Sequence, residues 1–96
     1  MLESALKKTC KKKLEASGWM VIHLIQTNQN GIPDTLILHP VKGLAFIEFK
    51  RPGRRTKNKS AEDIPEELQK YRIRKLREAG ARVLIVDREA DILELL

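Results

Sequence analysis

Apolar residues recur at helical spacing along the first part of the chain. Four of them lie four positions apart, namely Leu2, Leu6, Cys10 and Leu14. This spacing predicts a helix over residues 2–17, for which Gly18 supplies a C-terminal stop. Glu3 precedes Leu6 by three residues and so borders the apolar stripe, which predicts a carboxylate facing inward or sideways. The lysines of this segment fall mostly on the opposite face.

Three short segments with strand-like patterns follow. Residues 19–25 are almost wholly apolar, which predicts a buried central strand. Residues 34–39 predict a second strand, with Asp34, Leu36 and Leu38 on one face, and residues 44–50 predict a third. Because the connection over residues 40–43 is short, strands two and three are expected to form an antiparallel hairpin.

The second half of the chain begins with a polar stretch, and residues 51–64 lack periodicity, which predicts a loop. Pro65 suits the first turn of a helix that Gly80 ends. Gln69 lies on or beside the inward face of this helix, whose predicted buried stripe is Leu68, Ile73, Leu76 and Ala79. Residues 81–86 predict a fourth strand, and residues 87–96 a final helical turn or two. The order α-β-β-β-α-β with a short C-terminal helix predicts one α/β domain over residues 1–96, with helices flanking a mixed four-stranded sheet.

Composition narrows the class of protein. The lone Cys10 cannot form an internal disulfide, no Cys/His cluster suits structural zinc, and no apolar span of membrane length is present. We therefore expect a cytoplasmic protein with no membrane association. Nineteen Lys and Arg against thirteen Asp and Glu give a net charge of +6, which favours a polyanionic partner. A single basic run is usually a solvated face, but three runs, near residues 7–13, 51–59 and 72–77, favour phosphate binding.

Charged residues close the third apolar strand. Glu48 and Lys50 are two positions apart and so project from one face, where they cost free energy unless paired or bound to metal. Asp34 begins the neighbouring strand. Two carboxylates suit a divalent cation, and a lysine suits a reacting phosphate, so the three residues fit a metal-dependent phosphodiesterase. Plainer interpretations stay open, with Asp34 as a turn carboxylate and Glu48–Lys50 as an ordinary ion pair.

Four segments resemble the VRR-NUC family, a branch of the PD-(D/E)XK nuclease superfamily: GIPD at 31–34, FIEFK at 46–50, QKY at 69–71 and GARVLIV at 80–86. The resemblance implies a restriction-endonuclease-like core and a Mg²⁺- or Mn²⁺-dependent DNA nuclease. It also implies roles for single residues: metal ligation by Asp34, Glu48 and the Phe49 carbonyl, completed by Glu3, catalysis by Lys50, and positioning of Lys50 or water by Gln69. Small stand-alone, phage-type members dimerise and act on branched DNA, which implies a bacterial or phage-infected host cell.

We therefore expect a metal-dependent endodeoxyribonuclease that cuts branched DNA such as four-way (Holliday) junctions. A homodimer is expected because two symmetric cuts need two active sites. The cations after the catalytic strand are expected to hold the DNA backbone: Arg51, Arg54, Arg55, Lys57 and Lys59. Two alternatives stay open, a non-catalytic nucleic-acid-binding module on the same fold and a flap or RNA nuclease. Glu3 as an exposed helix acid and Gln69 as a helix-surface amide also stay open.

Overall fold

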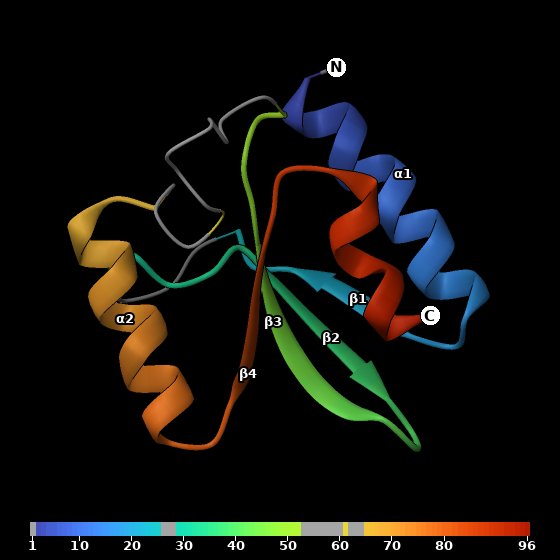
Figure 1. Cartoon of the computed structure of the whole chain (residues 1–96). Helices are drawn as coiled ribbons and strands as arrows, with labels where there is room; N and C mark the ends of the chain where they lie inside the picture. The colour runs from blue at the N-terminus through green and yellow to red at the C-terminus, as the bar shows by residue number, and fades with distance from the viewer. Residues whose placement is uncertain (1, 26–28, 53–60, 62–64) are drawn as a thin grey trace.

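The elements of the predicted order are all present in the structure (Figure 1), a computed structural model that describes residues 2–25, 29–52, 61 and 65–96. Along the chain they are α1 (Glu3–Ala16), β1 (Met20–His23), β2 (Thr35–His39), β3 (Gly43–Phe49), α2 (Glu67–Glu78), β4 (Arg82–Val86) and the 3₁₀ helix η2 (Glu89–Leu95). Most of the predicted loop over residues 51–64 lies outside the described residues. Where the chain is described, no helix combines the length and apolarity needed to cross a bilayer.

The sheet is mixed, as predicted, with the strand order β1-β2-β3-β4. The first three strands pair antiparallel, and β2 and β3 form the expected hairpin, with Thr35 opposite Ile47 and His39 opposite Gly43. The fourth strand joins β3 in parallel, with Phe49 opposite Val86. The parallel pairing follows because α2 carries the chain back across one face of the sheet.

The prediction of a buried central strand over residues 19–25 is wrong. Strand β1 lies at the edge of the sheet, and Met20 retains 63% of its accessible surface. An apolar run indicates that side chains favour burial, but it does not identify the neighbours of a strand. Only the flanking Trp19, 3% exposed, and the partly buried Val21 join the main core.

The helices lie on both faces of the sheet (Figure 1), with α1 and η2 against one face and α2 against the other. The predicted stripe of α1 is confirmed, since Leu6, Cys10 and Leu14 are buried in the main core. The stripe of α2 is confirmed only in part, because Ile73 is buried while Leu68 is 46% exposed. Helix α2 packs mainly on β4, and Leu68 in its first turn lies against Gly31 in the turn before β2.

Candidate active site

The pairing of β2 with β3 brings the two predicted acids together. Continuing the register one step beyond the Thr35–Ile47 pair sets Asp34 opposite Glu48, on neighbouring strands and the same face. The backbone N–H of Asp34 donates to Oε1 of Glu48 at 3.2 Å. The Asp34 carboxylate is itself oriented, because the Thr35 hydroxyl donates to its Oδ1 at 2.8 Å. The two carboxylates therefore border one site at the edge where β2 begins and β3 ends.

Lys50 is held beside these acids by two contacts. Its Nζ lies 3.2 Å from Oε2 of Glu48 and donates to Oε1 of Gln69 at 2.6 Å. Gln69 lies in the first turn of α2, so this contact fastens the helix to the end of β3. The Lys50 side chain is 16% exposed, which fixes its position and still leaves a path to solvent.

Glu48 is the site carboxyl whose pKa is raised by its surroundings. Burial raises the pKa of this carboxyl, and the neighbouring charge of Asp34 raises it further, while hydrogen bonding from Gln69 and the charge of Lys50 oppose the rise. The net direction is upward, so the surrounding groups do not fully compensate the ionised carboxylate. An additional cation beside Glu48 and Asp34 would stabilise their ionised forms.

Lys7 is a site residue that the sequence pattern did not identify. Its Nζ lies 3.1 Å from Oδ2 of Asp34 and 4.0 Å from Oε2 of Glu3, so one lysine from α1 bridges two acids. The prediction had assigned the lysines of α1 mostly to the opposite face. The signal was the i,i+4 spacing of Glu3 and Lys7, which sets both on the flank of the helix that borders the apolar stripe.

The side chains fit a hard divalent cation with few protein ligands. Within the described ranges, no group of three or more His, Cys, Asp or Glu residues could hold a metal. Two adjacent carboxylates, one of them buried with a raised pKa, match the donor set of Mg²⁺ or Mn²⁺, which retain waters and need few protein ligands. Asp34 and Glu48 would hold the ion, and Lys7 lies between this pair and Glu3.

Two shallow cavities flank the site. One, of about 340 Å³, includes Asp34 in its wall, and the other, of about 330 Å³, includes Lys50 and Gln69. Both are lined by Asn30 and Gly31, so the turn before Asp34 forms their shared wall. Gly31 has φ +83° and lies against Leu68 and Arg72 of α2, where a Cβ would crowd both side chains. This glycine lets the turn approach the helix that carries Gln69.

Comparison with known proteins gives a match in structure. No family model matches the chain, and no curated protein matches it in sequence. A solved structure described as a VRR_NUC domain superposes with a TM-score of 0.78 over 97% of this chain and 91% of that chain, at 26% sequence identity. This match supports the VRR-NUC family that the sequence resemblance indicated. The restriction-endonuclease-like architecture predicted from the VRR-NUC resemblance is thereby confirmed, and the chain is a nuclease-family domain.

Of the residues predicted from the VRR-NUC resemblance, the structure brings Asp34, Glu48, Lys50 and Gln69 together. The carboxylate of Glu3 is linked to them through Lys7, and Phe49 ends β3 next to Glu48. Metal ligation by Glu3 and by the Phe49 carbonyl stays a prediction. Among the expected backbone-binding cations, Arg51 is exposed, and the others lie outside the described residues: Arg54, Arg55, Lys57 and Lys59.

Proposed function

We propose that this VRR-NUC domain is a divalent-metal-dependent DNA endonuclease that hydrolyses phosphodiester bonds. The observation that supports it best is the ammonium of Lys50, fastened between Glu48 at 3.2 Å and Gln69 at 2.6 Å on the face that also carries Asp34. An ion pair with a purely structural role at a strand end needs no second hydrogen bond to a residue of a helix. A lysine that must meet a phosphate in one fixed orientation needs such a second contact.

In this proposal, Asp34 and Glu48 hold Mg²⁺ or Mn²⁺, and the bound ion supplies an activated water and a polarised phosphate oxygen. Lys50 supplies a fixed positive charge. An ammonium has three N–H donors, and contacts with Glu48 and Gln69 account for two of them. The third can donate to the scissile phosphate or to the attacking water, where negative charge develops. Gln69 positions Lys50 and adds no charge of its own.

The proposed substrate is branched DNA, including four-way junctions, and the proposed assembly is a homodimer. The net charge of +6 favours a polyanion, and the shallow cavities beside Asp34 and Lys50 suit an extended backbone better than an enclosed small molecule. Two copies would present two active sites to a symmetric junction. We also expect cutting that tolerates sequence.

A cleavage panel tests this function. Linear, flapped and four-way DNA, with RNA of the same shapes, are incubated with Mg²⁺, Mn²⁺ or chelator, and the solution mass of the protein is measured in parallel. We expect metal-dependent cutting of branched DNA by the wild type, and loss of cutting in Asp34→Asn. The matched control is Asp91→Asn, which removes a carboxylate from η2 on the other face of the sheet. Chelator-insensitive, salt-sensitive binding without any product would instead identify a binding module.

A further inference from the structure

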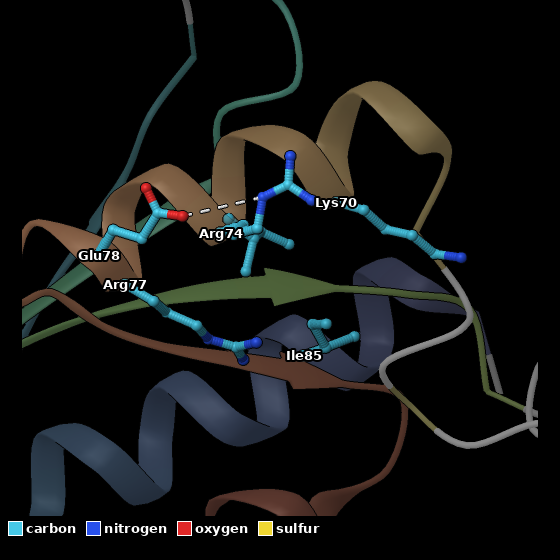
Figure 2. Close-up of a pocket in the computed structure, with 6 residues that line it drawn as sticks. Lys70, Arg74, Arg77, Glu78 and Ile85 are labelled. Atoms are coloured by element: carbon cyan, nitrogen blue, oxygen red, sulfur yellow. Dashed lines mark ion pairs between the residues drawn. The ribbon is translucent and has the colours of Figure 1, made fainter.

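A second basic surface lies on α2, and its lining includes none of the residues assigned to catalysis. A groove of about 540 Å³ opens between α2 and β4 (Figure 2). Its lining combines three cations, one acid and two apolar side chains: Lys70, Arg74, Arg77, Glu78, Ile73 and Ile85. Ile73 and Ile85, 4% and 5% exposed, form its floor. The groove is therefore a cationic surface with an apolar base.

The three cations are arranged along one flank of the helix. Their i, i+4, i+7 spacing sets Lys70 and Arg77 about 10 Å apart along the axis. The guanidinium of Arg77 donates to the carbonyl oxygen of Val83 at 2.7 Å, which fixes it across the gap between α2 and β4. Arg74 lies 5.6 Å from the ring centroid of Tyr71, a contact that restricts its guanidinium.

The acids nearby leave the groove positive. Lys70 lies 3.4 Å from Glu67, whose side chain is 93% exposed, and Arg74 lies 4.0 Å from Glu78, with both side chains more than half exposed. Exposed pairs of this length are worth about 0–1 kcal/mol, so an incoming anion can displace them. Among the residues that the structure describes, the lining carries three cations against one carboxylate.

The geometry points to a phosphodiester-backbone site, in which this groove holds the DNA strand next to the active site. The inference rests on the proposed function. A length of about 10 Å spans about two successive phosphates along one strand, and the apolar floor suits the sugar between them. Lys70 follows Gln69, which contacts Lys50 at 2.6 Å, so the groove begins one residue from the site. A strand in it would run toward the scissile phosphate.

Binding without hydrolysis tests the groove. The anisotropy of a labelled four-way DNA is measured in chelator over a range of salt concentrations, with the wild type, Arg74→Gln, and Lys70→Gln combined with Arg74→Gln. We expect the double variant to bind at least about tenfold more weakly and to lower the salt slope by about 2, and the single variant to lower it by about 1. The matched control combines Lys42→Gln with Arg82→Gln, which removes the same charge from exposed positions outside the three basic runs and should retain the slope.

The outcomes separate this surface from the hydrolytic proposal. Weaker binding in the groove variants supports the groove even if the wild type cuts no DNA with any metal. Equal affinity and slope in the groove variants and the control would overturn the groove, even if the wild type cuts. Polyglutamate binding as tight as that of DNA would assign the groove to acidic proteins and would also overturn it. Thermal melting of each variant checks that the fold is retained.

Discussion

The ammonium of Lys7 competes directly for the carboxylate that we assign to the metal. Its Nζ lies 3.1 Å from Oδ2 of Asp34, so a divalent cation bound by Asp34 must share this oxygen with Lys7 or displace the lysine. Lys7→Met retains most of the apolar stem and removes the charge. The variant should therefore bind Mn²⁺ more tightly than the wild type.

The magnitude follows from distance and exposure. Unit charges 4 Å apart interact by about 4 kcal/mol at an effective dielectric constant of 20 and by about 1 kcal/mol in water. The Lys7 and Asp34 side chains retain 29% and 25% of their accessible surface, and a long lysine can turn into solvent, so the lower part of this range applies. A penalty of about 1–2 kcal/mol corresponds to a roughly five- to thirtyfold change in Kd.

Isothermal titration of metal-free protein with Mn²⁺ measures this change. The matched control is Lys8→Met, which removes the same charge from the next, exposed position of α1 and should change Kd much less. An affinity of Lys7→Met equal to or weaker than that of the wild type would refute the competition. Absence of Mn²⁺ binding in every variant would refute the metal assignment to Asp34 and Glu48 itself.

Four further predictions concern the fold that supports the site. Gly31→Ala should lower the melting temperature by about 5 °C or more, because a Cβ there would lie 3.1 Å from Cγ of Leu68 and 3.2 Å from the Leu68 backbone. The control is Gly43→Ala, which has φ +85° and nothing within 4 Å of the added Cβ, and so introduces conformational strain alone. Burial raises the pKa of the Cys10 thiol to about 11, so its reaction with a disulfide reagent at pH 8 should be at least about a hundredfold slower in native than in denatured protein. Because the Cys10 pKa is raised on folding, the contribution of the protonated thiol to the free energy of unfolding is complete below about pH 8.5 and is lost as the pH rises through about 11. Denaturant titrations should show this decline in the wild type and not in Cys10→Ala. Trp19→Phe should lower the free energy of unfolding, measured by urea titration, by about 1 kcal/mol, because it removes the buried hydrogen bond from the indole N–H to the Leu95 carbonyl at 2.9 Å. An unchanged free energy of unfolding would contradict this.

Local patterns predicted the elements that depend on nearby residues. The four-residue spacing of Leu6, Cys10 and Leu14 was sufficient for α1, and the short turn after His39 was sufficient for the hairpin. The errors concern long-range packing. The apolar run of β1 did not show that the strand lies at an edge, and the stripe of α2 did not show that Leu68 stays 46% exposed.

The site depended even more on long-range contacts. The alternation of β3 placed Glu48 and Lys50 on one face, but Gln69 is nineteen residues from Lys50 in sequence. Only the family resemblance suggested their contact. Lys7 was missed because periodicity assigns a side chain to a face of its helix and does not report how far a flexible ammonium reaches toward a neighbouring strand.

The central claim is that the ammonium of Lys50 acts on the scissile phosphate. The most direct test is the single-turnover rate of four-way DNA cleavage with Mn²⁺ for the wild type, Lys50→Met and the control Lys42→Met, an exposed lysine of the turn between β2 and β3. Loss of a preorganised charge at the reacting phosphate predicts a rate about 10²–10³-fold lower in Lys50→Met at unchanged DNA affinity, and a rate near that of the wild type in Lys42→Met. Cleavage by folded Lys50→Met at the wild-type rate would contradict the account.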